Sequence, residues 1–133
     1  MKPKIKKKRV YPVALIQDDP GYVVRIPDLE ITTEGYDLAD AIAMARDAIA
    51  MKLLVMEDEG LEIPEPYSKF VSEKENDIET LVDVDMIEYR RKYDKRMVKK
   101  NCTVPYYLKV EAESRNINFS KLLQDALHEK LGI

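Results

Sequence analysis

Two short runs of β-branched and apolar residues open the patterned part of the chain. Residues 10–17 (VYPVALIQ) and 22–26 (YVVRI) predict two strands. The Asp-Asp-Pro-Gly sequence at 18–21 is typical of a turn, with the Pro-Gly pair suited to its central positions. A proline interrupts the second run, and residues 31–35 predict a third strand. The pattern therefore indicates an antiparallel meander in one sheet.

An apolar stripe at helical spacing follows these strands. Its members are Leu38, Ile42, Ala45, Ile49, Leu53 and Met56. Asp37 is a favourable N-cap and Gly60 a favourable stop, so the stripe predicts a helix of about 20 residues that packs on the sheet. Glu57 and Asp58 fall outside the stripe, which places them on the expected polar side.

The first domain is expected to end after one more strand. Residues 79–85 (ETLVDVD) alternate between polar and apolar side chains, which completes a βββαβ domain over residues 1–87. The composition then changes, because residues 88–100 contain seven Lys or Arg and only two acidic residues. We interpret residues 88–96 as a basic connector.

The last part of the chain, residues 97–133, predicts a strand followed by two helices. Its elements are a strand in KKNCTVP that Pro105 ends, a helix at 106–115, a turn at 116–118 and a helix at 119–131. The fold class expected for the whole chain is therefore α+β. A unit of roughly 40 residues is too small to bury an adequate core alone, so it should pair with a second copy.

Charge is distributed unevenly along the 133 residues. The net charge is only −3, but residues 10–87 contain nineteen acidic and five basic side chains. Residues 88–133 contain eleven basic and six acidic side chains, and residues 1–9 contain six basic ones. With 45% hydrophobic and 35% charged residues, the composition is typical of a folded protein.

Other features exclude several classes of protein. Cys102 is the single cysteine, which rules out an intrachain disulfide and a cysteine-based zinc site. Its predicted position on an inner strand face favours a small buried hydrophobe over a redox sensor. His128 has no second His or Cys near it in the sequence, so we expect no metal, and we also expect no cofactor. The apolar run after the basic N-terminus is too short to cross a bilayer, which favours a cytoplasmic protein without membrane contact.

The predicted C-terminal strand has two different faces. Lys99, Asn101 and Thr103 point to one side, while Cys102 and Val104 point to the other, because successive side chains alternate. A solvated edge strand is the plain alternative interpretation. The two helices that follow the strand favour a different interpretation.

Strand, helix, turn and helix in this order resemble the ribbon-helix-helix family of DNA-binding proteins. The resemblance implies a homodimer, or a higher oligomer built from it, whose paired strands enter the major groove of double-stranded operator DNA. Lys99, Asn101 and Thr103 match the base-reading positions. The turn has Asn116 where glycine is common, but Asn tolerates the left-handed conformation. Asn118 is expected to cap the second helix, and phosphate contacts are expected at its start from Asn118, Ser120 and Lys121.

Nearly the whole chain resembles the HicB antitoxins. The segments that carry this resemblance are YPVALIQDDPGYVVRIPDL, TTEGYDLADAIAMARDAI, LVDVD and RRKYDKRMVKKNCTVPYYL, in the expected order. The resemblance implies a degraded ribonuclease-H-like N-terminal domain and a C-terminal ribbon-helix-helix domain. It also implies that the chain binds and neutralises a HicA-type toxin, which cleaves messenger RNA, and represses the operon that encodes both proteins.

The acidic N-terminal domain agrees with such a partner, because a protein that binds RNA presents positive charge and an opposite field accelerates association. The possible toxin contacts are Asp18, Asp19 and Tyr22 at the predicted hairpin tip. A simple solvated turn remains the plainer interpretation of this sequence.

Two other functions compete with this hypothesis. One is a stand-alone transcriptional regulator whose N-terminal domain senses a ligand or only oligomerises. The other is a metal-dependent nuclease, which needs several carboxylates converging on two ions. Asp18, Asp19, Asp28 and Asp37 fall mostly in predicted turns and caps, so we expect no enzyme activity.

Overall fold

A computed structural model describes residues 7–66 and 74–133 of the chain. The chain is α+β and divides into two compact units, Met1–Lys95 and Arg96–Ile133, which we treat separately. Part of the basic N-terminal tail lies outside the described residues.

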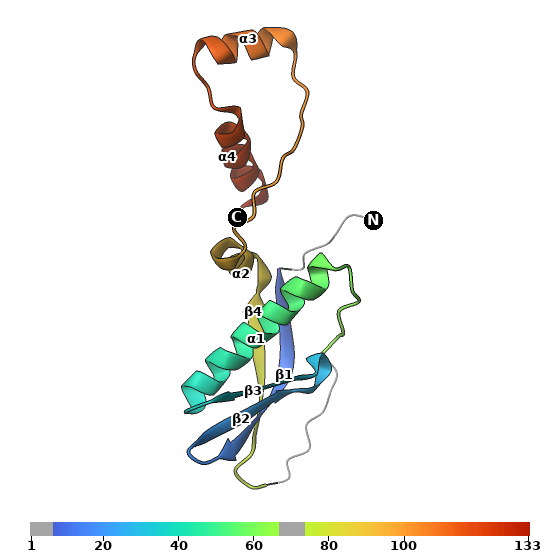
Figure 1. Ribbon diagram of the computed structural model, residues 1–133, viewed down its shortest axis with the longest axis vertical. Coiled ribbons are helices and arrows are strands. Elements are labelled where there is room, and N and C mark those ends of the chain that lie inside the picture. Colours follow the sequence, from blue (N-terminus) through green and yellow to red (C-terminus); the bar gives the residue numbers. More distant parts are fainter. Residues whose placement is uncertain (1–6, 67–73) are drawn as a thin grey trace. The chain divides into compact units, whose positions relative to one another are not determined.

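The N-terminal unit contains an antiparallel sheet of four strands. They are β1 (Lys8–Asp18), β2 (Gly21–Ile26), β3 (Ile31–Gly35) and β4 (Ile78–Asp85), in the spatial order β3-β2-β1-β4. A 3-10 turn, η1 (Pro27–Leu29), separates β2 from β3 at the predicted proline interruption. Helix α1 (Leu38–Asp58) crosses one face of this sheet (Figure 1). The four predicted strands and the long helix are therefore confirmed.

The turn between β1 and β2 lies one residue earlier than predicted. Asp18 pairs with Gly21, so Asp19 and Pro20 occupy the two turn positions, and the bond between them is cis. Gly21 is the first residue of β2. Position 21 requires glycine because a Cβ there would collide with the Gly35 carbonyl. The Pro-Gly pair was thus wrongly placed at the centre of the turn.

Helix α1 begins as expected but buries a slightly different face. The Asp37 carboxylate accepts a hydrogen bond from the Asp40 N–H at 2.7 Å, which confirms the predicted N-cap. Leu38 is 39% exposed, whereas Ala41 is fully buried against the sheet. At the other end Glu57 is buried, contrary to its expected position on the polar side.

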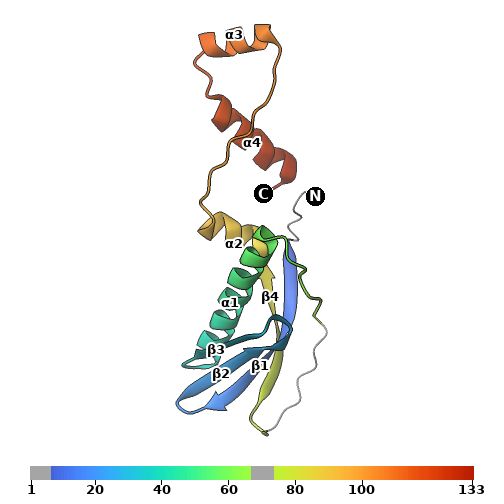
Figure 2. The ribbon, with the colours of Figure 1, turned by 45° about the vertical axis from the view of Figure 1, so that its right-hand side comes forward.

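The core of the unit lies between α1 and the sheet. It is formed by Tyr11, Val13, Leu15, Val24, Ile26, Leu29, Ala41, Ala45, Ile49, Ala50, Leu53, Val82, Val84 and Met86. Small alanines on α1 face large aliphatic side chains on the strands, which lets the helix lie close to the sheet. Figure 2 shows the same two layers from another side.

The segment predicted as an open connector contains a helix. Helix α2 (Met86–Tyr93) follows β4 directly, with the Asp85 carboxylate accepting from the Glu88 N–H at 3.0 Å. Met86 is fully buried in the core, and the contact unit extends to Lys95. The residues after Asp85 therefore belong to the first unit, because an N-cap and a buried methionine hold them there.

The C-terminal unit contains helices α3 (Tyr106–Ser114) and α4 (Phe119–Leu131), close to the predicted bounds. Asn116 has the expected left-handed conformation with φ 55° in the turn between them. Residues 97–105 have no regular structure, so the single chain lacks the strand predicted there. A ribbon strand needs a neighbour for its hydrogen bonds, and this chain offers none within the unit.

No residue between 96 and 133, all of which the structure describes, is buried. Within the described segments, no helix is both long enough and apolar enough to cross a membrane.

Candidate functional site

The β1–β2 hairpin and the start of α1 enclose a hollow of about 500 Å³. Its acidic and aromatic lining residues are Asp18, Asp19, Tyr22, Glu34, Tyr36 and Asp40. We call this surface the acidic notch. The three predicted toxin-contact residues all lie in it. The sequence did not suggest the other three, because strand register and helix position bring them beside the hairpin.

Close backbone contacts shape the acidic notch. A Cβ on Gly35 would lie 2.9 Å from the Ala41 Cβ, so the glycine lets β3 approach the first turn of α1. The Asp40 carboxylate accepts a hydrogen bond from the Tyr36 N–H at 3.0 Å. The Tyr36 side chain remains 76% exposed, so the acidic notch combines carboxylates with an accessible aromatic ring.

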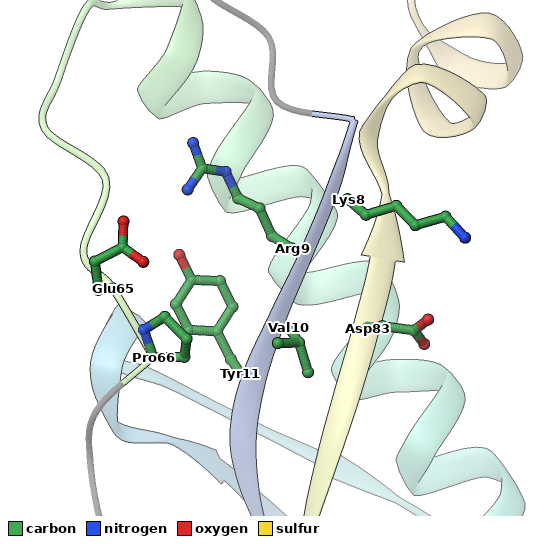
Figure 3. A pocket seen from close by; sticks show the side chains of 7 residues that line it. All are labelled: Lys8, Arg9, Val10, Tyr11, Glu65, Pro66 and Asp83. Carbon is green, nitrogen blue, oxygen red and sulfur yellow. The ribbon is translucent and has the colours of Figure 1, made fainter.

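A smaller cleft of about 180 Å³ lies beside the N-terminal end of β1 (Figure 3). The Tyr11 hydroxyl donates to the Pro64 carbonyl at 2.7 Å, which fastens the segment after α1 to the sheet. Burial raises the pKa of this hydroxyl, and the nearby Arg9 partly offsets the effect. The hydrogen bond gives Tyr11 a structural role.

Arg90 on α2 is surrounded by three carboxylates. Its guanidinium contacts Glu57 Oε1 at 3.4 Å, Asp58 Oδ1 at 3.0 Å and Asp94 Oδ2 at 3.0 Å. The side chains of Glu57 and Arg90 are only 2% and 13% exposed. This cluster joins the end of α1 to α2 and to the start of the segment that leads to the C-terminal unit. The sequence suggested Arg90 only as a connector residue able to reach DNA phosphates, whereas the structure pairs it with carboxylates of the N-terminal unit.

Burial raises the pKa of Glu57 above its ordinary value of 4.5, and the charge of Arg90 only partly opposes this. The folded chain therefore holds a proton that the unfolded chain has released, in the pH range just above 4.5. The contribution of Glu57 to stability consequently falls as the pH rises through that range.

We expect Glu57→Gln to reduce this pH dependence, because the amide occupies the same space without titrating. Urea unfolding of both proteins between about pH 4 and pH 7 measures the difference, because this range begins near the ordinary pKa of a glutamate. Equal slopes of unfolding free energy against pH would contradict the assignment. Exposed Glu88, replaced in the same way, serves as the control.

In the C-terminal unit, the predicted DNA-contact residues are all exposed. Asn118 caps α4 as predicted, since its side chain accepts from the Lys121 N–H at 3.0 Å. The Lys121 ammonium lies 2.9 Å from Asp125, in an exposed pair that contributes little stability. Ser120 follows the cap in the first turn of α4. Lys99, Asn101 and Thr103 lie in the irregular segment before α3.

The same unit has a hollow of about 640 Å³. Its apolar lining residues are Cys102, Val104, Phe119, Leu122, Leu123 and Ala126. Cys102 is exposed here, contrary to the buried position predicted for it. The expected burial requires something to fill this hollow.

Across the described residues, no three His, Cys, Asp or Glu side chains lie close enough together to hold a metal ion. Asp37 caps α1, Asp28 lies in the 3-10 turn, and Asp18 and Asp19 lie at the hairpin. The Asp18–Asp19 pair, Asp28 and Asp37 therefore belong to three different elements of the unit.

Comparison with known proteins identifies the family. Residues 11–126 match the model of the HicB-like antitoxins of bacterial toxin–antitoxin systems. The chain belongs to this family. A HicB-like antitoxin neutralises a toxin without catalysis, so the protein is not an enzyme.

This HicB-like antitoxin is similar in sequence to a phage protein and similar in fold to a chain of a solved complex. An uncharacterised 14.9 kDa protein from the rep-hol intergenic region of Haemophilus phage HP1 is 31% identical over 104 residues, which cover 74% of this chain and 75% of the phage protein. A solved toxin–antitoxin complex from Streptococcus pneumoniae contains a chain of similar fold, with a TM-score of 0.58 and 24% identity. That likeness covers 92% of this antitoxin and 99% of the other chain.

Proposed function

We propose that this antitoxin neutralises a HicA-type toxin, an enzyme that cleaves messenger RNA, by covering its RNA-binding surface with the acidic N-terminal unit. The observation that carries the proposal is charge: residues 10–87 contain nineteen acidic and five basic side chains. An RNA-binding surface is positive, so the two fields attract and accelerate association. The βββαβ order of the unit supports a degraded ribonuclease-H-like domain.

The acidic notch is the proposed point of contact. Asp18 and Asp19 would face basic side chains of the toxin, while Tyr22 would supply apolar area beside them. Tyr36 suits the same task, because exposed tyrosines often anchor protein interfaces.

Co-purification tests this function. The tagged chain is expressed with the small protein encoded beside it, and RNA cleavage by that protein is measured with and without the antitoxin. A stoichiometric complex that stops cleavage is the expected result. A partner that does not bind would refute the proposal and would favour a stand-alone DNA-binding regulator.

The C-terminal unit, for which we propose residues 97–133, would be a ribbon-helix-helix homodimer that binds operator DNA and represses its own operon. Its lack of buried residues supports dimerisation, since twelve large apolar side chains after residue 103 are exposed. The irregular segment at 97–105 would become a strand when a second copy pairs with it. The hollow beside α4 would then be filled.

In this dimer, Lys99, Asn101 and Thr103 would read bases in the major groove. The free N–H groups at the start of α4, with Asn118, Ser120 and Lys121, would bind a phosphate. A messenger-RNA-cleaving partner and an operator are both found in the cytoplasm, which is therefore the proposed location.

Two substitutions separate base reading from phosphate binding. We expect Asn101→Ala to weaken binding to the operator by about 1–3 kcal/mol, the range for a lost bidentate contact. Binding to unrelated DNA should stay unchanged. We expect Lys121→Ala to weaken binding to all DNA and to reduce its salt dependence. Fluorescence anisotropy at several salt concentrations measures both effects.

The exposed Lys130 near the end of α4 supplies the control for Lys121. Operator affinity that is unchanged in the Asn101→Ala protein would argue against the ribbon assignment.

A further inference from the structure

Strand β4 forms one edge of the sheet among the described residues. The Met86 N–H donates to the Lys7 carbonyl at 2.6 Å and continues the β1–β4 ladder, so the even-numbered residues of β4 face β1. The backbone groups of Leu81 and Asp83 therefore point outward. Arg46 agrees with this direction, because its Nε donates to the Asp83 carbonyl at 3.0 Å.

Within the described segments, nothing pairs with the outward N–H and C=O of Leu81 or with the N–H of Asp83. The opposite edge, β3, is shorter, with five residues against eight in β4. An unpaired edge is a template for another strand.

The side chains along this edge have a distinct pattern. Glu79, Leu81 and Asp83 all project from the sheet face opposite α1, giving the order acid, leucine, acid. Leu81 is 67% exposed, and Val10 of the neighbouring strand is 37% exposed on the same face. Figure 3 shows Val10 and Asp83 on the side of β1 away from Tyr11.

A groove of about 330 Å³ adjoins the same edge on the other face, between α1, the end of β4 and α2. Its apolar lining includes Ala50, Val84 and Tyr89. Its charged lining residues are Asp47, Asp85 and Glu88, which are acidic, and Arg46 and Lys92, which are basic. A strand added to β4 would direct alternate side chains into this groove. Arg46 lies at its rim with a half-exposed side chain that pairs with Asp83 Oδ1 at 3.6 Å, so an added strand would displace Arg46 from the Asp83 carbonyl.

The charges indicate what kind of strand fits. A second copy paired antiparallel about Leu81 would bring Glu79 opposite Asp83, and like charges in that position are unfavourable. A strand with basic side chains beside an apolar one would instead match Glu79, Leu81 and Asp83.

We propose that β4 is a strand-addition site for an extended, basic segment of the toxin, which joins the antitoxin sheet through the backbone of Leu81 and Asp83. This inference rests on the proposed toxin-neutralising function and adds a backbone contact to the charge contact at the acidic notch. Backbone pairing would supply affinity, and the alternating side chains would supply specificity.

Hydrogen exchange on the full-length antitoxin tests this directly. The probe is the small protein encoded beside the chain, added in excess. The amides of Leu81 and Asp83 should exchange at least about tenfold more slowly in the complex, because they become hydrogen-bonded. The outward amides of the opposite edge, Thr32 and Glu34, should not change. Unchanged exchange at Leu81 and Asp83 in a complex that does form would overturn the inference.

A pair of proline variants gives a second test. Leu81→Pro removes an outward N–H without removing a bond to β1, and Thr32→Pro does the same at the β3 edge. We expect Leu81→Pro to weaken toxin binding about tenfold and Thr32→Pro to leave it within about twofold. Leu81→Ala keeps the N–H and should have the smaller effect of the two changes at that position.

The outcomes separate the two proposals. If the wild-type chain binds and silences the partner but both proline variants bind equally well, the toxin-neutralising function stands and the strand-addition site is refuted. If the wild-type chain binds no partner, the function fails and the inference falls with it.

Discussion

Replacing Arg90 with alanine should lower the free energy of unfolding of the N-terminal unit by about 3–5 kcal/mol, the range for a buried ion pair that loses one partner. The Glu57 carboxyl is only 2% exposed, so without the guanidinium that now lies 3.4 Å away it would either carry an unpaired buried charge or take up a proton, and both cost stability. Asp58 and Asp94 would lose the same partner. Urea unfolding of the full-length chain, followed by circular dichroism, measures the change.

Arg91 provides a matched control on the same helix. Its pair with Glu88 is exposed on both sides, at 54% and 62%, so Arg91→Ala should change stability by less than about 1 kcal/mol. Adding Glu57→Gln to the Arg90→Ala protein should restore part of the lost stability, since no buried charge is then left alone at that position. Equal stabilities of the Arg90→Ala and Arg91→Ala proteins would disprove the structural role of the cluster.

Replacing Leu123 with lysine should abolish dimerisation of the C-terminal unit and reduce operator affinity by more than about a hundredfold, because a monomer loses half of the DNA contacts. Leu123 lines the hollow beside α4 and would lie in the shared core of the proposed dimer. A buried lysine without a partner is strongly unfavourable. Analytical ultracentrifugation gives the oligomeric state, and anisotropy gives the affinity.

Gln124→Lys introduces the same charge one residue further along α4 and leaves the lining of the hollow intact. We expect this control to remain dimeric and to bind the operator at least as tightly as the wild-type chain. A dimeric Leu123→Lys protein would mean that the second copy associates through another surface.

The Arg90 cluster also bears on how the two activities are combined. It holds α2 against α1 and includes Asp94, which ends α2 immediately before the segment that leads to the C-terminal unit. The N-terminal unit thus has a defined exit point for the chain. A loosened exit in the Arg90→Ala protein should appear as faster hydrogen exchange in α2.

Local signals were sufficient for most of the secondary structure. The N-caps Asp37 and Asn118 are correct because a side-chain oxygen needs only the N–H three residues later. The strand predicted at 31–35 has the same bounds in the structure, as does the final helix. Family membership was also readable, since the motifs occur in order along the chain.

Errors arose where distant residues decide. Glu57 appeared polar and exposed by helical spacing, but a partly buried arginine 33 residues later makes its burial possible. Helix α2 covers much of the segment that we interpret as a basic connector, and the composition of that segment did not indicate that Met86 is buried in the core. The predicted C-terminal strand requires a neighbour that the sequence of one chain does not contain.

The sequence by itself determined the four strands of the sheet, the helices α1, α3 and α4, the division of charge and the antitoxin family, because these depend on short-range spacing and composition. Tertiary structure alone decided which carboxylates meet in the acidic notch, that Arg90 pairs with the carboxylates at the end of α1, and which edge of the sheet remains open. These features depend on strand register and on the approach of α1 to the sheet. Register and approach result from packing between residues far apart in the chain, which no local pattern records.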